Sequence, residues 1–441
     1  MTDIILITIY SALIISIHYL SNPKIAYKGN IIAFFSVSLA LIYNLIRLSA
    51  TKLIISVFII SLGALIGIIL TNKTQTKSLP QNVALLNGLG GLSSTLISIT
   101  ELYLNNFSSP FILSIIYLGS ITFTGSLASI IRLNNTPLLI STQKLKYLSL
   151  LLLLLTIANL IIFPHSSLIR LFTFIALSSL TGFIFVLSIG KADMPIIISL
   201  LNSLSGFITS FIGINTNSIL LLITGTLIGA SGTILTIIMT KSMNRSLFSV
   251  LFHHQTYSIT SSSTPQNINK ASPKDVAFLL ENANKVIIVP GYGMAVSNAE
   301  DELKTLSDIL TTKYNTDTKF AIHPIAGRMP GHLNVLLAKA DIPLSQIYEL
   351  KDINQEFKTA DVAFIIGAND IINPKAQTDS TSPIYQMPIL NAKDAKKIIF
   401  AKRSLSPGYS GIDNPLFYQE NTLFLLGDAK EMTKKVIKEL E

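Results

Sequence analysis

The sequence VIIVPGYGMAV, residues 286–296, predicts a strand, a tight turn and the start of a helix. Val286–Val289 is a short apolar run, and Gly291 and Gly293 form the turn. Such a turn brings backbone N–H groups and a helix N-terminus close to a phosphate group. The stretch therefore predicts a nucleotide-binding domain, although Val296 stands where the common dinucleotide motif has Gly or Ala.

Residues 273–441 alternate strand-like and helix-like stretches, which is typical of an α/β domain with a parallel sheet. Strands are predicted at Val286–Val289, Lys319–Ile325, Ile347–Leu350, Val362–Ile366, Lys397–Ala401 and Leu423–Leu426. Helices are predicted at Ser297–Leu310, Gly331–Lys339 and Asp428–Leu440. We therefore expect a Rossmann-like parallel-sheet domain with both faces covered.

The region before residue 246 is far more apolar than a soluble protein. Only 13% of the chain is charged, against about 25% in soluble proteins. About nine segments approach the roughly 20 apolar residues that a membrane span needs. They are Ile4–Leu20, Ile31–Leu48, Leu53–Leu70, Val83–Leu104, Phe111–Ile131, Tyr147–Phe163, Leu168–Leu187, Met194–Ile214 and Ile219–Met239. We expect a multi-span α-helical membrane domain over residues 1–245 and a flexible linker over residues 246–272, rich in Ser, Thr and Asn.

Basic residues in the loops predict the orientation of this domain. Alternate loops carry Lys24, Lys28, Lys73, Lys77, Arg132, Lys144, Lys146, Lys191, Lys241 and Arg245, while the loops between them are nearly uncharged. Because cytoplasmic loops carry such an excess, we expect the N-terminus outside and the C-terminal domain in the cytoplasm. Because the basic residues of this region lie mostly in these short loops, the net charge of +9 gives little support to a nucleic-acid partner. Cysteine is absent, which excludes disulfides and cysteine-ligated metal sites, and we expect no metal.

Residues that follow the predicted strands indicate which dinucleotide binds. Sites for NAD place an acid about 20 residues after the turn, where it binds the ribose 2′-OH. The next strand here ends in His323 and Pro324 without an acid, whereas a later strand is followed by Lys402, Arg403 and Ser404. Lysine and arginine suit a 2′-phosphate, so NADP is the expected cofactor. The alternative for these three residues is a solvated basic turn.

Asn369 and Asp370 also follow a predicted strand, so we expect them at the same ligand-binding edge of the sheet. The alternative for Asp370 is a helix cap or an Asx-turn. The loop AGRMPGH, residues 326–332, has a spacing of Gly and Pro that suggests a backbone packed against a ligand.

Several motifs occur in an order that resembles one protein family. They are GYGMAV (291–296), HPIAGRMPGHLNVLLAKA (323–340), GANDIINP (367–374), MP (387–388), KRS (402–404), GYSGIDNPLFY (408–418) and GDAK (427–430), with ADMP (192–195), LLNSLSG (200–206) and MNRS (243–246) before them. Together they resemble the beta subunits of proton-translocating NAD(P) transhydrogenases over nearly the whole chain.

This resemblance implies an activity, partners and a location. The family transfers hydride from NADH to NADP⁺, driven by protons that move inward across the bacterial cytoplasmic (inner) membrane. NAD(H) binds on a separate alpha subunit, and two alpha–beta units form a dimer. The resemblance also implies which residues bind NADP(H): Gly291, Tyr292, Gly293, Met294, Ala295, Val296 and Arg328 near the pyrophosphate, Asn369 and Asp370 positioning the nicotinamide, Lys402, Arg403 and Ser404 at the 2′-phosphate, Gly408, Tyr409, Ser410 and Gly411 as a lid, and Gly427, Asp428 and Ala429 at the adenosine.

Polar residues within the spans suggest a proton path. Asn87 and Asn202 each lie seven residues after a proline that starts a predicted helix. We expect both about 10 Å from the cytoplasmic side, facing one another across a hydrated path, with Ser231 beside them. The alternative is that each Asn only bonds a neighbouring helix. The family commonly has His where Asn87 stands, and an amide does not carry a proton near neutral pH. Asp193, near the cytoplasmic face, is expected to link the membrane domain to the nucleotide domain, or to be a favourable charge at a helix N-terminus.

Two other functions fit parts of this sequence. A transporter or channel with an NADP-sensing cytoplasmic domain would need no hydride partner. A membrane NADPH oxidase or quinone reductase would need flavin or haem ligands, and no predicted span holds paired histidines suited to haem.

Overall fold

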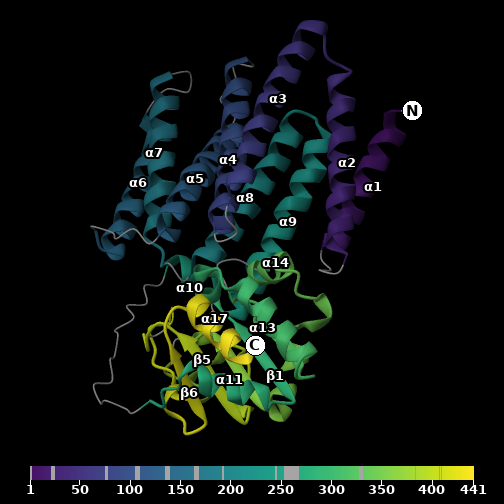
Figure 1. Ribbon diagram of the computed structural model, residues 1–441. Coiled ribbons are helices and arrows are strands. Elements are labelled where there is room, and N and C mark those ends of the chain that lie inside the picture. The colour runs from purple at the N-terminus through teal and green to yellow at the C-terminus, as the bar shows by residue number, and fades with distance from the viewer. Residues whose placement is uncertain are drawn as a thin grey trace. The chain divides into compact units, whose positions relative to one another are not determined.

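The computed structural model describes residues 2–20, 25–74, 78–104, 110–134, 140–162, 168–190, 193–243, 246–252, 268–326, 331–382, 384–406, 408 and 410–441. Long helices form its first half: α1 (Thr2–Leu20), α2 (Ala26–Leu45), α3 (Ala50–Lys73), α4 (Leu79–Leu104), α5 (Pro110–Leu133), α6 (Thr142–Ile162), α7 (Leu168–Leu187), α8 (Met194–Asn215) and α9 (Ile219–Ser242) (Figure 1). Among the described residues, 8 helices are long and apolar enough to cross a membrane, and α1 adds the shorter apolar stretch Leu6–Tyr19. The predicted multi-span helical membrane domain is thereby confirmed.

Contacts divide the chain into two compact units, Met1–Ser78 with Gly206–Ile228, and Leu79–Ser205 with Gly229–Glu441. In the first unit α1 packs against α2. In the second, α4 packs against α5, and α7 packs against both α5 and α6. Small residues let these helices approach closely. A Cβ on Gly91 of α4 would lie 2.7 Å from the Gly119 carbonyl oxygen of α5, and one on Gly182 of α7 would lie 2.6 Å from the Ile121 Cα.

The C-terminal region forms a six-stranded parallel sheet. The strands are β1 (Lys285–Pro290), β2 (Asp317–Ile322), β3 (Ile347–Glu349), β4 (Val362–Ile366), β5 (Lys397–Lys402) and β6 (Thr422–Leu426), in the spatial order β3-β2-β1-β4-β5-β6. All neighbouring strands are parallel, and the register places Ile288 beside both Phe320 and Phe364. This is the strand order of the Rossmann fold, so the predicted α/β domain is confirmed.

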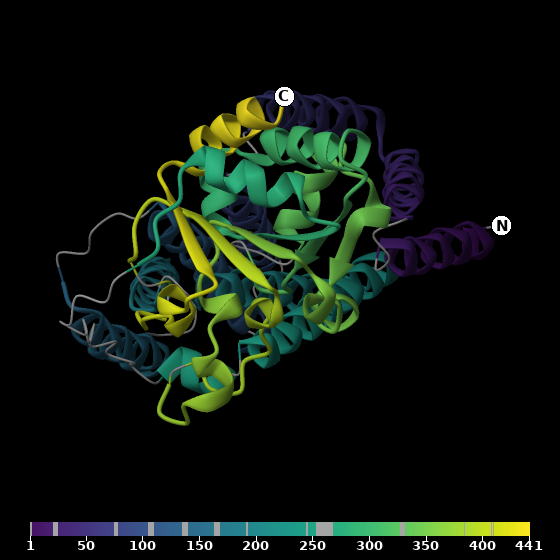
Figure 2. The same ribbon diagram turned by 60° about the horizontal axis from the view of Figure 1, so that its bottom comes forward.

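Helices of this domain are α11 (Pro273–Glu281), α12 (Tyr292–Ser297), α13 (Glu300–Thr312), α14 (His332–Lys339), α15 (Leu350–Ile353), α16 (Lys375–Thr378) and α17 (Ala429–Leu440). Short 3-10 helices are η3 (Leu344–Gln346), η4 (Glu356–Thr359), η5 (Asp370–Ile372), η6 (Ala392–Asp394) and η7 (Pro415–Tyr418). Helix α17 contacts both α11 and α13, and Figure 2 shows the yellow α17 beside green helices that cover the sheet.

Two predicted elements of the domain differ from the structure. The helix predicted at Ser297–Leu310 is divided, because Asn298 adopts a left-handed conformation (φ 49°) between α12 and α13. Helix α11 was not predicted, although Ser272 and Asp275 form a capping box at its start. In the predicted linker the structure forms a further short helix, α10 (Leu247–Phe252), and residues 253–267 lie outside the described part.

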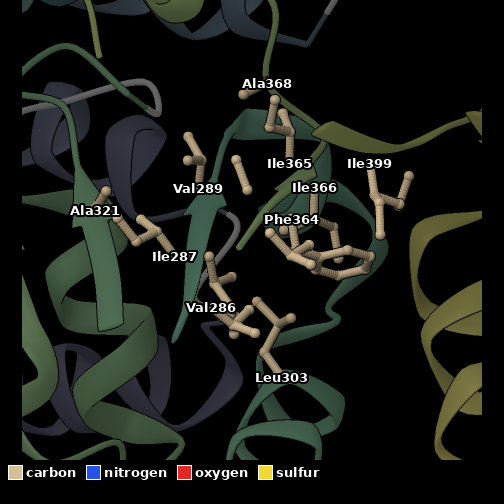
Figure 3. Close-up of a cluster of buried hydrophobic side chains, with 14 of the residues drawn as sticks. Val286, Ile287, Val289, Leu303, Ala321, Phe364, Ile365, Ile366, Ala368 and Ile399 are labelled. Carbon is tan, nitrogen blue, oxygen red and sulfur yellow. The ribbon is translucent and has the colours of Figure 1, made fainter. Parts of the chain in front are cut away.

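Apolar side chains on both faces of the central strands form the core of the sheet domain. Strands β1 and β4 are buried along almost their whole length, as expected for a parallel sheet covered on both faces. Figure 3 shows Val286, Phe364 and Ile399 from neighbouring strands together with Leu303 of α13. This packing fixes the carboxyl ends of β1, β4 and β5 relative to one another.

Candidate nucleotide-binding site

The chain reverses direction across the sheet between β1 and β4. From β1 it continues to β2 and β3 on one side, and it returns to β4, β5 and β6 on the other. Ligands of open parallel sheets bind outside the carboxyl ends of the strands at such a switch point. The residues after β1 and β4 are therefore the first candidates for a ligand site.

Glycines at these two strand ends pack directly against one another. Gly291 N–H donates to the Ile366 carbonyl at 2.8 Å, and Gly293 N–H donates to the Gly367 carbonyl at 2.9 Å. A Cβ on Gly293 would lie 2.7 Å from the Gly367 Cα, and Gly367 itself has φ +67°. The two glycines of the predicted phosphate turn thus close β1 onto β4, and both of these N–H groups have protein acceptors.

Side chains of the same turn face in two directions. Met294 and Ala295 are buried in the core, whereas Tyr292 and Val296 remain partly exposed. Val296, at the position where the common motif has Gly or Ala, is 40% exposed. Only Tyr292 and Val296 therefore present side chains outward from the 291–296 turn.

The end of β2 carries no acid. His323 follows β2 and is 1% exposed. Its Nδ1 accepts from Ile325 N–H at 3.2 Å, so Nε2 carries the proton and donates to the Pro388 carbonyl at 2.6 Å. Burial lowers the pKa of His323 to about 4, so the ring is neutral at neutral pH. Arg328, predicted near the pyrophosphate, lies outside the described residues.

Lys402 and Arg403 lie at the end of β5, as predicted. Lys402 Nζ donates to the Ser406 carbonyl at 2.6 Å and lies 4.8 Å from the centre of the Phe417 ring. Burial lowers the pKa of Lys402 to about 8, although Asp370 and Asp413 act in the opposite direction. An ammonium group that is partly removed from water gains more from an anionic ligand than a fully solvated one.

The structure brings the residues after β6 to this cluster. Gly427 N–H donates to the Lys402 carbonyl at 3.0 Å, and Arg403 forms an ion pair with Asp428. Asp428 also caps α17, because its Oδ1 accepts from Lys430 N–H at 3.0 Å. Ala429 is the buried first residue of α17, and Ser404 Oγ donates to Ser406 Oγ at 2.9 Å.

Asp370 holds the segment that was predicted as a lid. Its carboxylate accepts from Ser410 N–H at 3.0 Å and from Ser410 Oγ at 2.6 Å. A Cβ on Gly408 would overlap the same carboxylate. Tyr409 lies outside the described residues.

Two asparagines that were not predicted as site residues, Asn373 and Asn414, extend this connection. Asn373 Nδ2 donates to the Asp413 carbonyl at 3.3 Å, and Asn414 Nδ2 donates to Asn369 Oδ1 at 3.0 Å. Both occur as Asn-Pro, and each side-chain oxygen accepts from the backbone N–H two residues on, at Lys375 and Leu416. The one feature of the sequence that could have indicated these two residues is that each asparagine directly precedes a proline.

Comparison with known proteins identifies the family. Residues 2–439 match the family described as NAD(P) transhydrogenase beta subunit. The NAD(P) transhydrogenase subunit beta of Rhodospirillum rubrum is 38% identical over 446 residues, covering 96% of both chains. A sequence of the same name from strain ATCC 11170 of that species gives the same identity and coverage. This chain belongs to the NAD(P) transhydrogenase beta subunit family.

In the membrane part of this beta subunit, Asn87 lies against α8. It is 8% exposed, and its Nδ2 donates to the Ile198 carbonyl at 3.2 Å. Ile198 precedes Asn202 by one turn of α8. The Asn87 side chain, on α4, therefore contacts α8 one turn before Asn202. Asn202 is half-buried. Among the described residues, no hydrogen bond joins the Asn87 and Asn202 side chains directly.

Hydroxyl groups join α8 to α9 beside these asparagines. Ser203 Oγ lies 2.6 Å from Thr233 Oγ1, and Thr236 Oγ1 donates to Ser199 Oγ at 3.0 Å. Gly232 lets the backbones approach, since a Cβ there would lie 2.8 Å from the Ser203 Cα. Ser231 lies on an exposed face of α9 instead.

Asp193 is 7% exposed and immediately precedes α8, where its N–H donates to the Gly190 carbonyl at 3.1 Å. It therefore occupies the helix N-terminus that was one of its two predicted roles. Arg132 supports the same turn, because its Nε and Nη2 donate to the Ile189 carbonyl at 3.0 and 2.6 Å.

Proposed function

We propose that this beta subunit binds NADP(H) at the carboxyl edge of its sheet and exchanges hydride with NAD(H) bound on the alpha subunit, coupled to inward movement of protons. One observation carries the proposal. Lys402 and Arg403 meet the start of α17 beside the β1–β4 switch point, while the neutral His323 follows β2. The basic pair Lys402 and Arg403 suits a 2′-phosphate. His323 provides no carboxylate that could bind a ribose 2′-OH.

The residues present fit this dinucleotide. Lys402 and Arg403, with Ser404, would hold the 2′-phosphate, and the 427–429 segment would lie beside the adenosine. The turn 291–296 with Arg328 would approach the pyrophosphate, and Asn369 and Asp370 would position the nicotinamide end. Asn369 contributes a buried Nδ2 donor with no acceptor in the described part of the chain, which is a group that a bound ligand can satisfy.

Hydride transfer between two nicotinamides needs little from protein acids or bases. NADH loses a hydride to become NAD⁺, and NADP⁺ gains it to become NADPH, so both electrons and the hydrogen move together. The protein's task is to orient the two dinucleotides and to control their approach. Proton coupling requires that two conformations of the complex bind NADP⁺ and NADPH with different relative affinities.

The membrane domain would supply that coupling. We place it in the bacterial cytoplasmic membrane as residues 1–245, with the N-terminus outside. The linker 246–272 and the NADP(H)-binding domain 273–441 would lie in the cytoplasm, and two alpha–beta units would form a dimer. Asn87 and Asn202 would line the proton path, and Asp193 would connect it to the nucleotide domain. Since neither amide titrates near neutral pH, water or a partner residue must carry the proton.

Reconstitution tests this proposal. The beta subunit would be combined with its alpha subunit in vesicles that contain a pH-sensitive dye. NADH would be added together with acetylpyridine-NADP⁺, whose reduction has its own absorbance. We expect reduction that accelerates with an imposed proton gradient and changes the internal pH. Nucleotide-dependent ion flux without reduction would instead favour a transporter with an NADP-sensing domain.

A further inference from the structure

Asn369 carries a buried hydrogen-bond donor without an acceptor among the described residues. Its side chain is 7% exposed, and its Nδ2 atom has no hydrogen-bond partner there. The residue lies at the switch point, because its neighbour Ala368 packs against the β1 turn: a Cβ on Gly291 would lie 2.6 Å from the Ala368 Cα. A buried amide donor without an acceptor is unfavourable, so its presence requires an explanation.

Asn414 determines which way the Asn369 amide faces. Asn414 is fully buried, and its Oδ1 accepts from Leu416 N–H at 3.1 Å. Because a backbone N–H can only donate, the amide atom of Asn414 that faces Leu416 is the oxygen. The atom that faces Asn369 is therefore Nδ2. This Nδ2 donates to Asn369 Oδ1 at 3.0 Å and to the Asn369 carbonyl at 3.3 Å. The oxygen of the Asn369 amide is therefore held by Asn414, and its Nδ2 faces away from Asn414.

Further contacts fix the position of this pair. Asp370 accepts from Ser410, and Asn373 donates to the Asp413 carbonyl. Side chains of residues 369–373 are thus bonded to the segment 410–414 at three places. The Asn369 Nδ2 atom is itself shielded from solvent.

We infer that Asn369 Nδ2 donates a hydrogen bond to an oxygen of the bound dinucleotide, and that Asn414 is the positioning residue that presents this donor. The inference rests on the proposed function, since NADP(H) supplies the acceptor. Two groups of the dinucleotide offer such an oxygen at a switch point: the pyrophosphate and the nicotinamide carboxamide.

Two isosteric substitutions reverse or remove the donor in the full-length protein. Asn414→Asp still accepts from Leu416 N–H but cannot donate to Asn369, so the Asn369 amide turns and presents oxygen to the ligand. Asn369→Asp keeps the bond from Asn414 and places oxygen where Nδ2 was. We expect either variant to weaken NADP⁺ binding about tenfold. The matched control is Asn282→Asp at the exposed end of α11, where Nδ2 donates to the Phe278 carbonyl; it should bind normally.

Titration calorimetry with three probes locates the acceptor. A loss confined to NADP⁺ assigns the donor to the carboxamide. A loss shared by NADP⁺ and 2′-phospho-ADP-ribose, but absent for adenosine 2′-monophosphate, which lacks the pyrophosphate, assigns it to the pyrophosphate. Either result supports the inference. Unchanged affinities, or an equal loss for adenosine 2′-monophosphate, would overturn it.

An uncharged variant separates the lost donor from the added charge. Asn369→Ala removes the donor without introducing a carboxylate, so repulsion between charges cannot explain a weaker binding of NADP⁺. A normal NADP⁺ affinity in Asn369→Ala would also overturn the inference. If the unmodified protein binds no NADP⁺ at all, the proposed function fails instead. Thermal unfolding would verify that each variant is folded, and Asn369→Asp remains informative where Asn414→Asp does not fold.

Discussion

The guanidinium of Arg403 donates from Nε and Nη2 to one oxygen of Asp428, at 3.1 and 2.6 Å. The other oxygen of that carboxylate accepts from Lys430 N–H at the start of α17. One carboxylate thus joins the end of β5 to the start of α17, which follows β6. The Arg403 side chain is still 63% exposed, so its remaining N–H groups can reach a ligand.

This relationship predicts how dinucleotide preference is lost. Lys402→Ala combined with Arg403→Ala should remove the preference for NADPH over NADH. Each charge-assisted contact contributes about 1.5–3 kcal/mol, so NADPH affinity should fall by about 100-fold or more. NADH affinity should hardly change, because NADH lacks the 2′-phosphate. Titration of both nucleotides measures the ratio, with Lys393→Ala, a half-buried lysine bonded to Gln377, as control. A retained preference would place the 2′-phosphate elsewhere.

The pKa of Lys402 predicts a pH dependence for NADP(H) binding. At a pKa of about 8, the free protein carries the Lys402 charge below this pH and loses it above. NADPH affinity should therefore be constant near neutral pH and fall as the pH rises through 8, approaching about tenfold per pH unit. Titrations across this range would measure the fall. The Lys402→Arg variant keeps its charge and should flatten the profile. An identical fall in that variant would assign the titration to another group.

Much of the domain could be predicted because its determinants are local. Each predicted strand is an apolar run between polar or turn-forming residues, and the ligand edge follows from the direction of parallel strands. Lys402 and Arg403 were therefore found at the correct edge. Their contacts with Gly427 and Asp428 depend on the pairing of β5 with β6, which the sequence does not display.

Contacts between distant segments were the part that could not be predicted. Gly291 and Gly293 have the composition of a phosphate turn, but their N–H groups bond β4 and the residue after it, and the β1–β4 pairing joins strands far apart in the chain. In the membrane domain, α9 has small or hydroxyl residues on several faces. The rotation of α9 about its axis could therefore not be predicted from the sequence. In the structure, Gly232 and Thr236 face α8, whereas Ser231 is exposed.

The close contact between β1 and β4 predicts a stability effect at Gly367. Gly367→Ala would add both backbone strain at φ +67° and a Cβ 2.5 Å from the Gly293 Cα. Gly331 has a similar φ of +72°, but a Cβ there would meet nothing within 4 Å in the part of the chain that the structure describes. We expect Gly331→Ala to lower the free energy of unfolding by about 1–2 kcal/mol and Gly367→Ala by a further ~1–3 kcal/mol. Urea unfolding of both variants measures the difference. Equal losses in the free energy of unfolding would mean that the β1 turn moves to accommodate the new Cβ with no further loss of stability.

The position of Asn202 predicts a variant that separates coupling from nucleotide binding. Asn202→Leu keeps a side chain of similar size but removes the amide that lies one turn from the Asn87 contact on α8. Proton-coupled hydride transfer should slow by about tenfold or more, since a polar group in a path is replaced by an apolar one. NADPH affinity should stay within about twofold, because its proposed binding residues are elsewhere in the chain.

Asn44→Leu is the matched control for this variant. Asn44 is also an intramembrane amide, but its Nδ2 donates to the Ala40 carbonyl of its own helix at 2.8 Å. Both variants would be reconstituted with the alpha subunit, and reduction would be recorded with and without a proton gradient. Slowing by Asn202→Leu alone would assign this amide to the path. Equal slowing by both variants would indicate a general effect on the membrane helices, and an unchanged coupled rate would remove Asn202 from the path.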